Sequence, residues 1–133
     1  MLSFLPVIVP PMFELSVDRE FCAAHAIMLI GRREPVHGHN WRVRVTLNGP
    51  VLNADGILCD FHMLEKRVDE ILRPFHNNDL NEIPPFDELN PTTEHIAKYI
   101  AEQTVMNLPA TISGVRVTVT EAPGCRAGYS IEI

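Results

Sequence analysis

The sequence predicts an α+β fold in which a four-stranded antiparallel sheet carries two helices on one face. Four segments alternate apolar and polar residues, which is the period of a half-buried strand. Two segments between the second and third strands carry apolar residues at helical spacing. The resulting order of strand, strand, helix, helix, strand, strand favours an antiparallel sheet whose second face meets water or another subunit.

Each predicted strand has a recognisable boundary. The first runs on toward His25, the second ends at the turn Asn48-Gly49-Pro50, and the last two form a hairpin around Pro123-Gly124. Open sheet edges expose unpaired backbone groups that can pair with other chains. We therefore expect the sheets of several subunits to close edge to edge into a ring. The alternating apolar residues are Phe13, Leu15 and Val17; Val43, Val45 and Leu47; Val115, Val117 and Val119; and Tyr129, Ile131 and Ile133.

The two helices have capping signals of their own. Asp60 is a favourable N-cap for the first helix, which should end at Pro74, and Thr92 or Thr93 can cap the second. The polar, proline-rich stretch 74–91 between them is too long for a simple turn, and such loops often carry function. The apolar stripes are Phe61, Leu64, Val68 and Ile71 in the first helix and Ile96, Ile100 and Val105 in the second.

The composition is that of one globular domain. Of 133 residues, 46% are hydrophobic and 21% are charged, within the range of folded proteins. We assign residues 12–133 to a single domain and residues 1–11 to an N-terminal extension, with Met12 as an alternative start. The extension is apolar but lacks the basic segment of a signal peptide and is too short to span a bilayer.

The net charge and the cysteine content limit the partners and the cellular compartment that we expect. The net charge of −6 argues against a nucleic-acid partner, although a local pair such as Arg32 and Arg33 can still attract an anionic substrate. Cys22, Cys59 and Cys125 have no metal-binding or redox spacing and cannot all pair, which favours a reducing compartment. We therefore expect a soluble, cytoplasmic protein with no membrane partner.

Three histidines form the strongest functional signal. His37 and His39 stand at i and i+2 near the start of the second strand, so both imidazoles point to the same face. His25 ends the preceding strand, and an antiparallel return brings it opposite the pair. Three imidazoles suit zinc and leave a fourth position open, as in catalytic zinc sites. The alternative is that these are ordinary histidines of a strand and a loop, because short motifs match by chance.

Several motifs together resemble the 6-pyruvoyl tetrahydropterin synthase and 6-carboxytetrahydropterin synthase family. The similarity runs from Met12 to the C-terminus in the family's order. The resemblance implies that His25, His37 and His39 bind zinc, and that the antiparallel sheets assemble through barrel-forming trimers of the tunnelling-fold type into a homohexamer. The motifs are residues 21–25 (FCAAH), 37–40 (HGHN), 59–61 (CDF), 80–84 (LNEIP), 90–94 (NPTTE) and 120–123 (TEAP).

The resemblance also implies a pterin pocket. Glu121 matches the family's glutamate anchor, and a buried carboxylate can accept two N–H donors from the 2-amino-pyrimidinone edge of a pterin. Its alternative role is that of a surface carboxylate in a hairpin turn. Thr92, Thr93 and Glu94 match the segment that completes the family's pocket, and they also suit a helix cap with an acidic first turn.

The catalytic cysteine of the family is absent. The family places it shortly before the HGH motif, where this chain has Glu34 instead. Some members with glutamate there are associated with cleaving the side chain of dihydroneopterin-type substrates. A carboxylate near zinc can act as a general base, so we predict that Glu34 replaces the cysteine. The alternative is that Glu34 pairs with Arg32 or Arg33 in a solvated loop.

A second departure affects proton transfer. The family carries an Asp-His pair before the Leu80-Asn81 segment. An ungapped match places His76 on the aspartate and Asn77 on the histidine, whereas one inserted residue places His76 on the histidine and Phe75 on the aspartate. The pair is broken in both alignments, and His76 remains the acid–base candidate.

The resemblance, with these residues, implies a zinc-dependent lyase or synthase acting on a dihydropterin. Zinc would serve as Lewis acid, Glu34 would remove a proton, and His76 would donate or accept one. Retro-aldol cleavage of the side chain is the simplest chemistry, and elimination of triphosphate competes with it, with Arg32 and Arg33 holding a phosphate tail. The alternative function is that of a catalytically silent or neofunctionalised pterin-binding paralogue.

Overall fold

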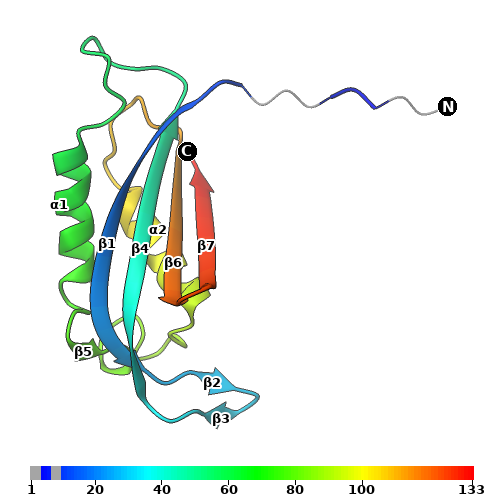
Figure 1. Cartoon of the computed structure of the whole chain (residues 1–133), viewed down its shortest axis with the longest axis vertical. Helices are drawn as coiled ribbons and strands as arrows, with labels where there is room; N and C mark the ends of the chain where they lie inside the picture. The colour runs from blue at the N-terminus through cyan, green and yellow to red at the C-terminus, as the bar shows by residue number, and fades with distance from the viewer. Residues whose placement is uncertain (1–3, 7–9) are drawn as a thin grey trace.

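The computed structural model describes residues 4–6 and 10–133, and it has the predicted α+β class with two helices (Figure 1). The four long strands and the two helices lie close to their predicted positions, and three two-residue strands and a 3-10 turn are additional. The elements are β1 (Phe13–His25), β2 (Met28–Leu29), β3 (Arg32–Arg33), β4 (His37–Gly49), α1 (Phe61–Leu72), β5 (Asn78–Asp79), η1 (Leu80–Glu82), α2 (Thr93–Thr104), β6 (Gly114–Ala122) and β7 (Cys125–Glu132).

The sheet is mixed and five-stranded, so the prediction of a four-stranded, wholly antiparallel sheet is wrong in this respect. Its order is β5-β1-β4-β6-β7, and the pairs β1–β4, β4–β6 and β6–β7 are antiparallel. The chain returns to the sheet after α1, where the Asn77 N–H donates to the Cys22 carbonyl at 2.6 Å. Residues 78–79 then continue beside 23–24 as a parallel pair. A strand of two residues is too short to show alternation in the sequence.

Both helices begin directly after residues that the sequence predicted as caps. The Asp60 carboxylate accepts the His62 N–H at 2.8 Å, and the Thr92 hydroxyl accepts the His95 N–H at 3.1 Å. These bonds satisfy donors that a helix leaves free in its first turn. Helix α1 ends at Leu72, shortly before the predicted stop.

The core lies between the two helices and one face of the sheet. Odd-numbered residues of β1 and β4 turn toward it, and the strands pair residue by residue along their whole length, from Phe13 opposite Gly49 to His25 opposite His37. Figure 1 shows α2 behind the sheet and α1 beside β1. The largest buried side chains are Trp41, Phe21, Phe86, Leu47, Leu64, Leu80, Ile96 and Ile100.

Of the predicted N-terminal extension, residues 1–3 and 7–9 lie outside the described residues. The flanking residues 4–6 and 10–11 have no helix or strand, and the side chains of Phe4 and Leu5 are exposed. Within residues 4–6 and 10–133, no helix is both long and apolar enough to cross a bilayer.

Candidate metal centre

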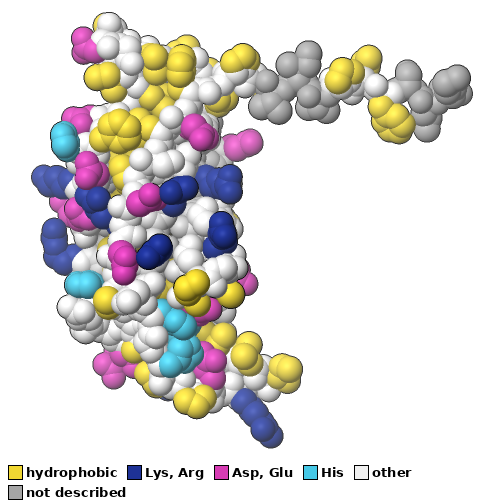
Figure 2. All heavy atoms as spheres, viewed as in Figure 1, with side chains coloured by type: hydrophobic (Ala, Val, Ile, Leu, Met, Phe, Trp, Pro, Cys, Tyr) yellow, Lys and Arg dark blue, Asp and Glu magenta, His cyan; other side chains and the backbone are white. Residues whose placement is uncertain are grey.

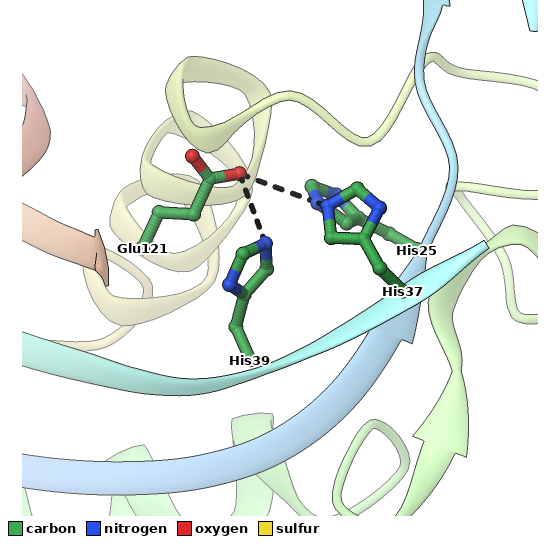
Figure 3. Close-up of side chains that lie close together, drawn as sticks. All are labelled: His25, His37, His39 and Glu121. Carbon is green, nitrogen blue, oxygen red and sulfur yellow. Dashed lines mark hydrogen bonds and ion pairs between the residues drawn. The ribbon is translucent and has the colours of Figure 1, made fainter. Parts of the chain in front are cut away.

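Three histidines and one glutamate converge where β1 ends and β4 begins (Figure 3). His25 and His37 are direct cross-strand partners, and His39 follows on the same face of β4. Glu121 comes from the end of β6, where the pairing with β7 shifts register between Thr120 and Ala122. Such an irregularity can re-aim one side chain. Glu121 is thereby directed at the three imidazoles (Figure 3).

Two of the imidazoles are held by backbone carbonyls. His25 Nδ1 lies 2.9 Å from the Pro91 carbonyl, and His37 Nδ1 lies 2.9 Å from the Pro35 carbonyl. Because a carbonyl oxygen only accepts, each Nδ1 donates its proton, and the lone pair of each Nε2 is left for another partner. The two Nε2 atoms are 3.2 Å apart. This is the arrangement of histidines that ligate a metal through Nε2.

His39 completes the group from a partly buried position. Its Nε2 is buried and makes no hydrogen bond to any described residue. Burial lowers the pKa of His39 below its ordinary value of 6.5, and nearby His25 and His37 lower it further, while the Glu121 carboxylate opposes the shift. His39 is therefore neutral at pH 7, which is the form that binds metals.

Trp41 packs behind the cluster and fixes two of its rings. The indole lies edge-on to His25 and His39, with ring centroids 4.8 Å and 5.1 Å away, and its N–H donates to the Ala23 carbonyl at 3.1 Å. Sequence reasoning missed Trp41, although it continues the i, i+2 alternation of His37 and His39 on the same face of the strand.

The donor set fits a metal ion. One ligand atom from each of His25, His37, His39 and Glu121 lies within 4.8 Å of the others. Imidazole nitrogens and a carboxylate oxygen are ligands that zinc accepts in tetrahedral sites. The buried, unpartnered Nε2 of His39 also needs a partner, because an unpaired buried polar atom is costly.

Glu34 lies beside this cluster. Its carboxylate Oε1 is 3.8 Å from His37 Nε2 and accepts the Ile27 N–H at 3.1 Å, while its own N–H donates to the Ile27 carbonyl at 3.0 Å. Among the described residues, its only ion contact is to His37 and none is to Arg32 or Arg33. The structure therefore does not contain the alternative, an ion pair between Glu34 and Arg32 or Arg33 in the loop.

His76 is not part of the cluster. Its Nδ1 accepts the Cys22 N–H at 3.1 Å on the β5 side of β1, whereas His37 and His39 lie on β4 and thus across β1. Cys22 stands three residues before His25, and three residues of a strand span about 10 Å. His76 therefore lies outside hydrogen-bond reach of the histidine cluster in its own chain.

The start of α2 borders the cluster through its backbone. The Pro91 carbonyl that holds His25 directly precedes Thr92, whose hydroxyl is occupied as the helix cap. Thr93 is partly buried and Glu94 is exposed in the first turn. The segment is thus close to the candidate site, and its capping function is evident.

Two asparagines hold the chain that leaves His25. Asn81 accepts the Ala26 N–H at 2.7 Å and donates to the Ala26 carbonyl at 2.8 Å. Asn90 binds Met28 in the same two-bond manner, at 2.8 Å and 3.0 Å. These pairs tie the segment after His25 to the stretch between α1 and α2, and so position both His25 and the Glu34 contact at Ile27. Nothing in the sequence pattern indicates such side-chain to backbone pairs.

The centre opens to the surface on the side of the β2–β3 hairpin. The His37 side chain is 39% exposed, whereas that of His25 is 1% exposed. Figure 2 shows histidine side chains reaching the surface next to the hairpin, whose exposed apolar residues include Met28, Leu29 and Ile30. A small molecule can therefore approach the cluster from this side.

Fold and site together define an α+β protein with a candidate metal centre at the ends of paired strands. The family model for 6-pyruvoyl tetrahydropterin synthase matches residues 14–132. The chain is 36% identical to the dihydroneopterin monophosphate aldolase of Pyrococcus furiosus over 112 residues, or 84% of this chain and 90% of that one. It is 34% identical to the 6-carboxy-5,6,7,8-tetrahydropterin synthase of Bacillus subtilis, over 86% and 82% of the two chains.

Solved structures show the same fold. The 6-pyruvoyl tetrahydropterin synthase of Plasmodium vivax superposes with a TM-score of 0.79 at 23% identity, over 92% of this chain and 99% of that one. A variant of that protein, with its catalytic glutamate replaced by alanine, superposes with a TM-score of 0.77 at the same identity and coverage. The family match and the sequence relatives are decisive: this chain belongs to the 6-pyruvoyl tetrahydropterin synthase family.

Proposed function

We propose that the protein is a zinc-dependent lyase that cleaves the side chain of a phosphorylated dihydroneopterin. The observation that carries this proposal is the position of Glu34, whose carboxylate lies 3.8 Å from His37 Nε2 at the edge of the three-imidazole cluster. The Pyrococcus relative is named as an aldolase for dihydroneopterin monophosphate, and the match covers 84% of this chain and 90% of that one.

His25, His37 and His39 would hold the zinc ion. When bound, zinc acts as a Lewis acid that polarises a substrate oxygen. The carbonyls of Pro91 and Pro35 keep two of these histidines in the tautomer whose Nε2 is free to bind. Trp41 excludes water from behind the rings.

Glu121 would anchor the pterin ring, with Thr92, Thr93 and Glu94 completing the pocket. A carboxylate can accept the two adjacent N–H groups of the 2-amino-pyrimidinone edge, which fixes both the position and the orientation of the ring. The side chain of Glu121 is 30% exposed, so a ligand can reach it.

Glu34 would act as the general base. In a retro-aldol reaction it takes the proton of the hydroxyl on the second side-chain carbon. The bond between the first and second side-chain carbons then breaks, its electron pair moves into the pterin ring system, and a two-carbon aldehyde leaves. The first carbon regains a proton and remains on the ring as a hydroxymethyl group. A glutamate is also the catalytic residue replaced in the Plasmodium vivax variant.

His76 would supply or accept a proton only in an assembly. It lies on the outer side of β1, away from the cluster of its own chain, so it can serve only a site to which a second chain contributes. A homohexamer of two barrel-forming trimers would bring sheet edges of neighbouring chains together and also protect the open edge at β7.

We place this assembly in the cytoplasm, with residues 12–133 as the catalytic domain and residues 1–11 as an extension.

Arg32 and Arg33 would hold the phosphate of the substrate. Both are exposed on β3, next to Glu34, and the described residues form no ion pair with either. Free guanidinium groups at the mouth of the centre suit a phosphate, which they can bind in a bidentate manner.

One observation favours a second candidate, a pterin-binding protein without turnover. Within one chain the cluster has a base in Glu34 but no acid at hydrogen-bond distance, because His76 lies elsewhere. A protein of this kind would bind pterins through Glu121 and release no product at any pH.

The test is an assay that identifies products. Zinc-loaded protein is incubated with dihydroneopterin, its monophosphate and its triphosphate, and the products are separated by mass. We expect a hydroxymethyl pterin and a two-carbon aldehyde or its phosphate. Inorganic triphosphate would instead show the elimination chemistry of a synthase. Pterin binding without either product would support the silent binder and exclude the lyase.

A further inference from the structure

Glu121 stands closer to the histidines than a pure pterin anchor requires. Its Oε1 lies 3.2 Å from His25 Nε2 and 3.6 Å from His39 Nε2. Figure 3 shows the carboxylate turned toward the imidazoles, with its nearer oxygen facing His25 and His39. The register shift at the end of β6 is what brings this side chain over the cluster.

Three of the six separations among the four ligand atoms are close to the edges of a metal-centred tetrahedron, and the four atoms lie within 4.8 Å of one another. Four ligand atoms bound at 2.0–2.2 Å to one zinc ion are separated from each other by about 3.3–3.6 Å. The His25–His37, His25–Glu121 and His39–Glu121 separations are 3.2, 3.2 and 3.6 Å. A charge-assisted hydrogen bond between histidine and carboxylate would instead be about 2.7–2.9 Å long. The carboxylate is thus placed as a ligand rather than as a hydrogen-bond partner.

The unpaired Nε2 of His39 also indicates that Glu121 is placed as a metal ligand. The buried Nε2 has no hydrogen-bond partner among the described residues, although a carboxylate oxygen lies 3.6 Å away. If Glu121 served only to neutralise the histidines, closing that gap to a hydrogen bond would remove a costly unpaired group. The gap is accounted for when a common ion stands between the two atoms.

We propose that Glu121 is the fourth ligand of the metal in the resting protein and that it leaves the metal when a pterin binds. The inference rests on the proposed function, because accepting both N–H groups of a pterin turns the two oxygens of Glu121 toward the ring edge and away from the ion. A site with four protein ligands is closed, and a site with three is open to substrate. The centre would therefore open only when the ring edge is present to take the carboxylate.

This exchange would couple recognition to activation. The substrate gives Glu121 two hydrogen bonds in place of one metal bond, and the fourth position becomes free next to the substrate side chain. Only a molecule with the 2-amino-pyrimidinone edge can make the exchange favourable. Small anions would then compete poorly for the resting metal, because a protein ligand already fills the position.

Metal affinity provides the first measurement. Zinc affinity of the full-length protein is determined by competition with a chromophoric chelator for wild type, Glu121→Gln and Glu132→Gln. Loss of a ligand should weaken binding by at least about tenfold in Glu121→Gln, the lower range seen even for indirect partners of a metal. Glu132 is exposed on β7 and serves as the matched control, with unchanged affinity expected. Equal affinity of Glu121→Gln and wild type would overturn the proposal, as would a wild type that binds no metal.

Cobalt spectroscopy provides the second measurement and does not depend on the folding of a variant. Neopterin, which has the same ring edge, is titrated into the cobalt-loaded wild type while its fluorescence reports binding. We expect the visible cobalt bands to change in step with occupancy, and Glu121→Gln to lack that neopterin-dependent change. Cobalt bands that stay constant in wild type at full neopterin occupancy would disprove the exchange.

The outcomes separate this inference from the lyase proposal. A neopterin-dependent cobalt spectrum in a protein that turns over no dihydroneopterin phosphate would retain the ligand exchange and remove the lyase. Turnover by the wild type, together with full zinc affinity in Glu121→Gln, would retain the lyase and remove the ligand exchange.

Discussion

His25 and His37 face each other across β1 and β4 as direct cross-strand partners, and their Nε2 atoms lie 3.2 Å apart. Each ring is held from behind by a proline carbonyl, so both nitrogens turn their lone pairs toward the same point. Two lone pairs at this separation repel unless an ion or a proton lies between them. The facing Nε2 atoms of His25 and His37 are therefore the strongest structural indication of a metal site.

Removing a ligand should strongly weaken metal binding, whereas removing an unrelated histidine should not. We expect His37→Ala and His39→Ala to lower zinc affinity by at least about 100-fold, because even indirect partners of a metal contribute 10–100-fold. His62→Ala is the control, since that side chain is 93% exposed on α1. Metal content after gel filtration and chelator competition measure both. Full zinc occupancy in His37→Ala and His39→Ala would show that the assignment is wrong.

Stability of the metal-free protein should fall on mild acidification. Burial lowers the pKa of His39 in the folded state below the ordinary 6.5, so the unfolded chain binds more protons in this range. The contribution of His39 is therefore present above pH 6.5 and lost as the pH falls from there toward the lower, folded-state pKa. Urea midpoints measured across this window should decline less in His39→Gln than in wild type. Identical slopes for the two proteins would contradict the expectation.

Glu34 should be needed for turnover but not for binding. Loss of a general base typically costs 10²–10⁴-fold, so we expect Glu34→Gln to lower kcat by about that factor with zinc affinity unchanged. Glu20→Gln, on the opposite face of the sheet, controls for the change of charge. The measurement is product formation from dihydroneopterin monophosphate. A kcat for Glu34→Gln within twofold of wild type would exclude Glu34 as the base.

Subunit mixing should reveal whether His76 works in another chain's site. Glu34→Gln and His76→Ala are each expected to be inactive alone. If a site takes Glu34 from one chain and His76 from another, refolding a 1:1 mixture should restore roughly a quarter of the sites. Refolding each variant by itself is the control. A mixture as inactive as its components would mean that no site takes Glu34 from one chain and His76 from another.

Asn81 should contribute to stability through Ala26. Replacing Asn81 by leucine keeps a similar volume but leaves the Ala26 N–H and carbonyl without their partners. Each unpaired buried group costs about 1–3 kcal/mol, so the free energy of unfolding should fall by at least about 1 kcal/mol. Gln103→Leu, at an exposed position of α2, should change it by less than about 0.5 kcal/mol. Urea unfolding measures both, and equal values would argue against the positioning role.

Much of the fold could be predicted from local patterns. The alternation at Val43, Val45 and Leu47 identifies β4 because side chains of a strand alternate between two faces. Asp60 and Thr92 identify the helix starts because a cap satisfies donors only two or three residues away. Each of these signals depends only on residues a few positions apart, so it can be recognised from the sequence.

The candidate centre was predictable in part. His37 and His39 share a face because of their spacing, and the turn of the chain places His25 opposite them. The position of Glu121 beside the same ion site was not predictable, since it depends on the β4–β6 pairing and on a register shift against β7. The same holds for the bonds from Asn81 to Ala26, which join residues 55 positions apart.

The sequence by itself determined the four long strands, the two capped helices, the three histidines and the family. Tertiary structure alone decided that a short β5 runs parallel to β1, that His76 lies away from the cluster, and that Glu121 approaches His25 and His39 within 3.6 Å. The physical reason is the range of the interactions. Periodicity and capping depend on neighbours along the chain, whereas ligand geometry depends on how distant strands pack.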